Sequence, residues 1–239
     1  MIRAVLFDWY DTLARVDGDR IVAGRRQLAA RAGVDAETMA ALWRETAEQR
    51  MLGRLGSLEQ EIAYILQRLG ATPSPALVTE LARIELDTWH AAVSLYPAAR
   101  PTLATLKARG YRLGVVSNCS YPAGQAIEHA GLADLFDAFT LSFQVGLAKP
   151  QPEIYTHACQ ALGVTYAETM FVADGAFGEL DAAAALGITT VLVEQEGQSR
   201  AYGSSSRWDY KVTTLAALLP LLEAQTDEPR GVASTDSSG

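Results

Sequence analysis

Two apolar runs of this chain end in carboxylates, and these acidic residues are well suited to chemistry. Asp8 ends the run Ala-Val-Leu-Phe, and Asp174 ends the run Met-Phe-Val-Ala, with Glu179 following five residues later. In an open α/β sheet, ligands bind in the crevice outside the carboxyl ends of the strands. Asp8 is therefore a candidate nucleophile or metal ligand, although a carboxylate at this position can also simply cap a turn.

Polar side chains follow two further apolar runs. Ser117 and Asn118 close the run Tyr-Arg-Leu-Gly-Val-Val, and Lys149 stands in the later loop Gly-Leu-Ala-Lys-Pro. Lysine is scarce here, and the other two lysines of the chain are Lys107 and Lys211. Each of these side chains alone can serve a turn or a solvated surface. Together at one sheet edge, a hydroxyl, a lysine and several carboxylates predict a catalytic site.

The chain from residue 96 onward shows alternating strand and helix patterns. Strands are expected over residues 111–117, 139–142, 170–174 and 188–193, and helices over 98–109, 123–130, 152–162 and 180–186. Repeated strand–helix units imply a parallel sheet with helices on both faces. We therefore predict an α/β fold with a Rossmann-like three-layer core, in which the polar strand ends share one edge.

Between the first strand and residue 96 the apolar spacing is helical and strand-like runs are absent. We expect an all-helical insert over residues 16–93 and an α/β core made of residues 1–15 and 94–222. Because the insert follows Asp8 directly, it is expected to cover the strand edge as a lid that excludes water.

The composition limits the partners and the compartment. The 239 residues carry a formal net charge of −8, and 49% of them are hydrophobic. This acidity argues against general nucleic-acid binding, which needs a basic surface. We see no signal peptide and no apolar run of membrane-spanning length, so we expect a cytoplasmic protein without a membrane partner. Residues 197–206 are expected to form a loop and residues 223–239 a disordered tail. The sequence leaves the oligomeric state open.

Four motifs in order give the chain a family resemblance. They read Phe-Asp-Trp-Tyr-Asp-Thr-Leu (7–13), Val-Val-Ser-Asn (115–118), Lys-Pro-Gln-Pro-Glu-Ile-Tyr (149–155) and Val-Ala-Asp-Gly-Ala-Phe-Gly-Glu-Leu (172–180). With these motifs the chain resembles the haloacid dehalogenase-like (HAD) hydrolase superfamily. The helical insert after the first motif resembles the C1-type cap of that superfamily.

The resemblance implies a nucleophilic mechanism. Asp8 would attack the electrophilic centre and form an acyl intermediate that water then hydrolyses. Lys149 would supply the positive charge that a weak carboxylate nucleophile needs. Ser117 and Thr12 would hydrogen-bond the transferring group or the nucleophile, and Asn118 is a candidate substrate contact.

The resemblance also implies a metal ion. Asp8, Asp174 and the backbone carbonyl of Tyr10 would hold Mg²⁺ in the oxygen-only, partly hydrated shell that this ion prefers. Glu179 is expected to reach the metal through water, although the helix dipole also favours a glutamate in a first helical turn. The expected partner is a small-molecule substrate, whose identity lies in cap contacts that no local motif encodes.

The chain departs from the family's phosphatases at Tyr10. Those enzymes usually carry an aspartate at this position as general acid and base, so Tyr10 itself and the neighbouring Asp11 are candidates for that role. Tyrosine here is similar to the haloacid dehalogenases, which cleave carbon–halogen bonds without a metal. Arg44, near the position of a cap arginine that cradles halide or carboxylate, and Tyr155 add to this likeness, and both are candidate substrate contacts.

The last motif favours the opposite interpretation. Dehalogenases carry Ser and Asn where this chain has Asp174 and Glu179. An acidic pair beside Asp8 would repel a carboxylate substrate unless a cation lay among them, since like charges ~4 Å apart cost about 4 kcal/mol at an effective dielectric of about 20. We therefore predict a Mg²⁺-dependent phosphatase acting on a small phosphorylated metabolite. The alternatives are a metal-independent 2-haloacid dehalogenase and a non-catalytic HAD-fold binding protein.

Overall fold

The computed structural model describes residues 1–195 and 205–227 of the chain. Its centre is a six-stranded sheet in the order β5-β4-β1-β6-β7-β8, and every strand pair in it is parallel. β1 lies inside the sheet, bonded to β4 on one side and to β6 on the other. The predicted α/β fold with a Rossmann-like three-layer core is confirmed. The strands are β1 Ala4–Phe7, β4 Arg112–Ser117, β5 Ala138–Leu141, β6 Thr169–Ala173, β7 Thr189–Val193 and β8 Tyr210–Val212.

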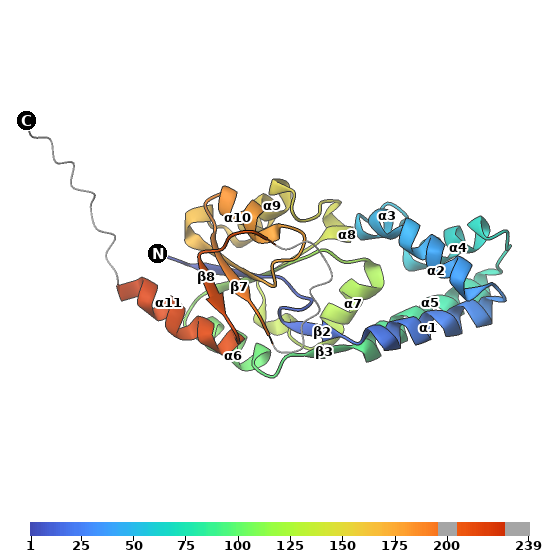
Figure 1. Cartoon of the computed structure of the whole chain (residues 1–239), viewed down its shortest axis with the longest axis horizontal. Coiled ribbons are helices and arrows are strands. Elements are labelled where there is room, and N and C mark those ends of the chain that lie inside the picture. Colours follow the sequence, from blue (N-terminus) through green and yellow to red (C-terminus); the bar gives the residue numbers. More distant parts are fainter. Residues whose placement is uncertain (196–204, 228–239) are drawn as a thin grey trace, which may run out of the picture.

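Side chains of β1 alternate between two buried clusters, one on each face of the sheet. Val5 and Phe7 belong to the cluster covered by α6, α7 and α11. Ala4 and Leu6 belong to the cluster covered by α9 and α10 (Figure 1). Because both faces of β1 are buried, its backbone is held rigidly up to the point where it ends. The helices are α6 Ala99–Ala108, α7 Tyr121–His129, α8 Ser142–Val145, α9 Pro152–Leu162, α10 Glu179–Ala185 and α11 Leu218–Asp227, with short 3₁₀ turns at Ala133–Leu135, Tyr166–Glu168 and Leu215–Ala217.

Five helices over residues 18–92, which we call the helical lobe, lie together beyond one end of the sheet (Figure 1). They have a buried cluster of their own, to which Leu28, Trp43, Ile62 and Leu81 contribute. The lobe therefore packs around its own apolar centre as well as against the core. The helices are α1 Gly18–Ala32, α2 Ala36–Glu45, α3 Ala47–Met51, α4 Leu58–Arg68 and α5 Pro75–Ala92.

Short polar residues begin four of the lobe helices. The side chains of Asp17, Asp35, Ser57 and Ser74 each accept a hydrogen bond from a backbone N–H in the first turn of α1, α2, α4 and α5, respectively. Such N-caps contribute about 1 kcal/mol each by satisfying donors that have no partner within the helix. The local sequence thus fixes where each helix begins.

A small antiparallel ribbon joins the helical lobe to the core. β2 (Ala14–Val16) pairs with β3 (Val93–Leu95), and Val16 lies opposite Val93 where the chain leaves and returns. The boundaries that the sequence suggested, 15/16 and 93/94, fall inside this ribbon. Its strands were not predicted, because three residues are too few to show a period-2 pattern.

The last helix extends past the predicted end of the core at residue 222. α11 continues to Asp227, so the first residues of the expected tail are helical, while 228–239 lie outside the described residues. The helix is held there by the buried Leu218 and Leu222 and by an ion pair between Arg109 and Glu223 at 2.7 Å. Most of the expected loop 197–206 also lies outside the described residues. Among the helices that are described, none combines the length and apolarity needed to cross a membrane.

A stacked pair of imidazoles joins the helical lobe to the core. His90 on α5 and His129 on α7 have ring centroids 4.2 Å apart and ring planes inclined by 9°. The Nε2 atom of His90 is buried without a hydrogen-bond partner in the described part of the chain. Burial and the neighbouring His129 lower the pKa of His90, and Asp87 opposes them. His90 is therefore favoured in its neutral form.

We expect this junction to weaken in mild acid. Because folding lowers the pKa of His90 below its unfolded value, the unfolded chain binds more protons, and the free energy of unfolding falls as the pH drops through that window. When the pH is lowered from about 7.5 to about 5, the unfolding temperature of His90→Gln should fall less than that of the wild type. His157→Gln, which changes a histidine away from this junction, should behave as the wild type. Equal losses in His90→Gln and wild type would contradict the expectation.

Candidate active site

Asp8 follows the last residue of the internal strand β1. Its backbone N–H still donates to the carbonyl of Val172 at 2.9 Å, so the β1–β6 ladder fixes its position. The carboxylate is buried, and its Oδ1 atom lies 2.5 Å from Nζ of Lys149. The hydroxyl of Thr12 donates to Oδ2 at 3.5 Å. The structure thus brings Asp8, Thr12 and Lys149 together at the sheet edge.

Asn118 positions the loop that carries Lys149. Its amide Nδ2 donates to the carbonyl of Lys149 at 2.9 Å, and its Oδ1 accepts the N–H of Lys149 at 2.8 Å. This pair of bonds ties the loop after α8 to the end of β4. Asn118 was predicted to contact substrate. It does line the pocket, but its amide is already engaged by the backbone.

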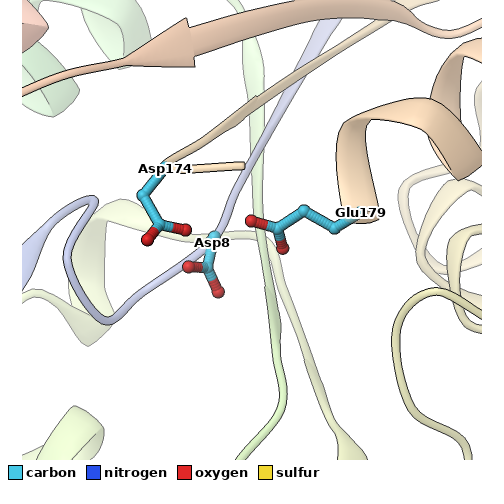
Figure 2. A group of neighbouring side chains, drawn as sticks. All are labelled: Asp8, Asp174 and Glu179. Carbon is cyan, nitrogen blue, oxygen red and sulfur yellow. The ribbon is translucent and has the colours of Figure 1, made fainter. Parts of the chain in front are cut away.

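Three carboxylates converge at this edge of the sheet, as Figure 2 shows. Asp8, Asp174 and Glu179 each offer an oxygen, and these oxygens all lie within 4.8 Å of one another. Glu179, which is 1% exposed, pairs with Nζ of Lys149 at 2.6 Å and accepts the N–H of Gly175 at 3.2 Å. Asp174 is only partly buried and accepts the N–H of Ala176 at 3.1 Å. The three come from the ends of β1 and β6 and from the start of α10.

Burial dominates the electrostatics of this cluster. It raises the pKa of Asp8, against the opposing charge of Lys149, and Asp174 adds to the rise. Burial also raises the pKa of Glu179 well above its ordinary value, with Lys149 again opposing. Burial alone would lower the pKa of Lys149, but Asp8 and Glu179 outweigh it and hold that pKa above its ordinary value. One ammonium thus neutralises only part of a buried acidic group.

Ser117 ends β4 beside these residues. Its hydroxyl is buried, lines the pocket and has no hydrogen-bond partner among the described residues. Leaving a buried hydroxyl unpaired costs free energy, so such an atom is suited to bind a ligand oxygen.

A pocket of about 470 Å³ opens over this edge. The sheet edge forms one wall, and residues of β2, α1 and α5 form the other. A pocket of this volume suits a small organic ligand. The lining residues are Asp8, Tyr10, Asp11, Val16, Gly18, Ile21, Arg25, Trp89, Ser117, Asn118, Lys149, Asp174, Gly175, Ala176, Phe177 and Glu179.

Tyr10 and Asp11 follow β1 and both line this pocket, but their side chains have different surroundings. The hydroxyl of Tyr10 donates to the carbonyl of Ala123 at 2.7 Å, and its ring packs on Trp89 with centroids 5.8 Å apart. Burial raises the pKa of Tyr10 well above its ordinary value, so its proton stays in place. Asp11 adopts φ of +57°, an uncommon conformation for a residue other than glycine. Burial and then Asp174 raise the pKa of Asp11 to about 6.

Two predicted substrate contacts lie elsewhere. Arg44 is absent from the pocket lining: α2 turns Leu42 and Trp43 inward, which leaves Arg44 exposed with its Nε donating to the carbonyl of Ala40 at 3.3 Å. Tyr155 is fully buried beneath the site, and its hydroxyl donates to the carbonyl of Glu179 at 2.9 Å. Neither side chain reaches the pocket, and Tyr155 instead supports the start of α10.

Arg25, Trp89 and Phe177 line the pocket although the sequence did not single them out as site residues. From its sequence position Trp89 could equally be a core residue of the helical lobe. The position of Phe177 is set by the conformation of its loop, which the sequence pattern does not give. A signal for Arg25 does exist: it follows Gly18 and Ile21 at helical spacing, on a face of α1 where an apolar residue would be expected.

This parallel α/β fold, with a buried aspartate, a lysine and further acids at its strand ends, is that of a hydrolase. The chain belongs to the haloacid dehalogenase-like hydrolases, whose family model matches residues 2–187.

Phosphatases and haloacid dehalogenases are both among the relatives to which the chain is similar. A glyceraldehyde 3-phosphate phosphatase from Methanopyrus kandleri is 29% identical over 82% of this chain and 85% of its own length. An (S)-2-haloacid dehalogenase from Burkholderia cepacia is 29% identical over 92% of this chain and 95% of its own. The crystal structure of a 2-haloacid dehalogenase from Pseudomonas syringae, 23% identical, superposes with a TM-score of 0.72 over 94% of this chain and 100% of that one, which supports the fold alone. The comparisons therefore support a hydrolase and do not separate phosphatase from dehalogenase.

Proposed function

We propose that this chain is a Mg²⁺-dependent phosphatase that uses Asp8 as its nucleophile on a small phosphorylated metabolite. Charge balance carries the proposal. Asp8, Asp174 and Glu179 converge, and Lys149 pairs with Asp8 and Glu179, so two formal negative charges lack a cation whenever all three carboxylates are ionised. In a metal-free site this excess negative charge would repel a carboxylate substrate, whereas a bound divalent cation would neutralise it.

The donor set fits the proposed ion. It consists of oxygen atoms, and the partly exposed Asp174 faces the pocket, as suits an ion that keeps several waters. Asp8, Asp174 and the backbone carbonyl of Tyr10 would hold Mg²⁺. Glu179, already engaged by Lys149, would reach it only through water. When bound, the ion supplies positive charge beside the transferring group.

The residues around Asp8 support phosphoryl transfer. Asp8 would attack the phosphorus of the ester while the ester oxygen leaves. Water would then attack the phosphorus of the aspartyl phosphate, releasing inorganic phosphate and restoring the carboxylate. Lys149, 2.5 Å from Asp8, would keep the nucleophile ionised, and the unpaired hydroxyl of Ser117 would donate to a phosphoryl oxygen.

A panel of phosphate esters and 2-haloacids, each assayed with Mg²⁺ and with a chelator, tests the proposal. We expect release of inorganic phosphate that needs Mg²⁺, and no halide. Phosphate release unaffected by the chelator, or no phosphate release from any ester, would refute it.

The second candidate is a metal-independent 2-haloacid dehalogenase. It is favoured by Tyr10, whose hydroxyl is fixed on the carbonyl of Ala123 and so is withdrawn from acid–base work. In the same panel, halide release that persists in chelator would select this candidate.

Asp11 is our candidate for protonating the leaving group, since it lines the pocket and Tyr10 is engaged elsewhere. In Asp11→Asn we expect hydrolysis of alkyl phosphates, whose leaving oxygen needs a proton, to fall roughly 10²- to 10⁴-fold. Hydrolysis of p-nitrophenyl phosphate, whose leaving group needs none, should fall far less. Equal effects of Asp11→Asn on both esters would remove Asp11 from this role.

A further inference from the structure

Arg25 brings a positive charge to the wall of the pocket that faces the sheet edge. It lies on α1 of the helical lobe and lines the pocket together with Gly18 and Ile21 of the same helix. Its side chain is 30% exposed, so the guanidinium is neither fully buried nor free in solvent. One face of it lies 5.1 Å from the ring centroid of Trp43.

Glu85 on α5 holds this arginine from inside the lobe. The carboxylate of Glu85 is fully buried, and its Oε1 accepts a hydrogen bond from Arg25 at 3.4 Å and another from the indole N–H of Trp89 at 3.1 Å. Both residues, Arg25 and Trp89, line the pocket. One buried carboxylate therefore orients two side chains of the lobe wall.

Arg25 still has donors to spare. An arginine carries five N–H donors in a planar fork, and Glu85 takes one of them at a distance long for a charge-assisted bond. The Nε atom of Arg25 is buried without a partner among the described residues, so the donors left for a ligand are those of its terminal nitrogens. A guanidinium satisfied only in part and placed on a pocket wall is well suited to receive an anion.

The charges around the pocket show what kind of anion this would be. The other lining cation, Lys149, is paired with two carboxylates, Asp8 and Glu179. Arg25 is paired with one, Glu85, so it keeps more donors for the far end of a ligand. Because Asp8, Asp11, Asp174 and Glu179 also line the pocket, a singly charged group meets less repulsion there than a doubly charged one.

Resting on the proposed phosphatase function, we propose that Arg25, oriented by Glu85, recognises a carboxylate at the end of the substrate remote from the phosphate. The substrate class is then a phosphate ester of a small hydroxy acid. Its carbon chain would lie between the two charged ends, along the apolar side chains of Val16, Ile21 and Trp89. Arg25 is a specificity-determining residue in this proposal, and Glu85 a positioning residue.

Binding of two matched phosphonates tests the proposal without requiring turnover. 3-Phosphonopropionate carries the remote carboxylate, and propylphosphonate replaces it by a methyl group. Calorimetry in Mg²⁺ should show wild-type protein preferring 3-phosphonopropionate. In Arg25→Gln that preference should fall roughly 10- to 100-fold, the usual weight of a hydrogen bond to a charged group. Arg26→Gln, which removes the same charge from the exposed neighbouring position on α1, should keep the preference.

Two further variants separate recognition from mere support of the fold. Arg25→Lys keeps the charge but not the fork, so it should restore part of the preference. Glu85→Gln should lower the preference while affinity for propylphosphonate changes less. Asp87→Asn, an exposed change on the same helix, should leave both affinities as they are. An unchanged preference in Arg25→Gln would overturn the proposal, as would equal loss of both ligands in Glu85→Gln.

The outcome also distinguishes this inference from the function on which it rests. If wild-type protein binds neither phosphonate, the phosphoryl site is refuted. The role of Arg25 is then tested by measuring the binding of succinate, which carries carboxylates only. Succinate binding that is lost in Arg25→Gln would support recognition of a carboxylate by Arg25. Succinate binding that survives this change, or no succinate binding by the wild type, would overturn it.

Discussion

Asp8→Asn should abolish hydrolysis of p-nitrophenyl phosphate in Mg²⁺, by roughly 10⁴- to 10⁶-fold, as expected when a nucleophile is removed. The amide keeps the size of the carboxylate but cannot attack phosphorus. Folding should survive the change, because burial already disfavours the charged form of Asp8 and Lys149 keeps its partner Glu179 at 2.6 Å. Thermal unfolding of the variant should therefore occur at or above the wild-type temperature.

A matched control separates this effect from loss of a negative charge. Asp134→Asn makes the same substitution at an exposed position and should retain wild-type activity. Substantial turnover in Asp8→Asn would exclude Asp8 as the nucleophile. An inactive but unfolded Asp8→Asn protein would instead contradict the prediction that its fold survives.

Lys149→Met should be the most destabilising of the changes considered. It leaves Asp8 and Glu179 buried without their cation, and breaking such a pair costs about 3–5 kcal/mol. The two carboxylates would then hold their protons to higher pH than in the unfolded chain. The loss of stability should therefore be larger near pH 7.5 than near about pH 5, because stability falls as the pH rises above the unfolded carboxylate pKa.

Mg²⁺ provides a second measurement on this variant. If the acidic cluster binds the ion, added Mg²⁺ should raise the unfolding temperature of Lys149→Met more than that of the wild type. Lys107→Met removes a partly exposed lysine paired with Asp137 at 2.5 Å, and it should cost no more than about 1 kcal/mol. A Lys149→Met protein as stable as Lys107→Met would contradict the buried charge balance described here.

The parts of this protein that depend on short-range patterns were predictable. Strand patterns alternating with helix patterns that end in glycine predicted the parallel sheet with helices on both faces, but they did not predict the order of its strands. Asp8, Ser117, Lys149 and Asp174 were predictable as a group because each lies at the end of a strand or in the segment after one, and parallel strands end on one edge.

The lobe wall of the pocket could not be predicted in the same way. Whether Arg25 or Arg44 faces the sheet depends on how α1 and α2 are rotated about their axes, and that rotation is set by packing among the lobe helices. Tyr155 illustrates the same limit, because its hydroxyl donates a hydrogen bond to the carbonyl of Glu179, which is distant in the sequence. Local spacing places a residue on an element, while tertiary contacts decide where its side chain points.

The β2–β3 ribbon makes the two halves of the pocket separable. Val16 and Val93 lie opposite each other at its open end, so a two-residue Asn-Gly turn would close the strands into an ordinary β-hairpin. Such a shortened chain would keep Asp8, Lys149 and Asp174 on the sheet edge and lose Arg25 and Trp89. Segments exchanged between relatives at this seam should therefore transfer substrate choice and leave the bond-breaking residues unchanged.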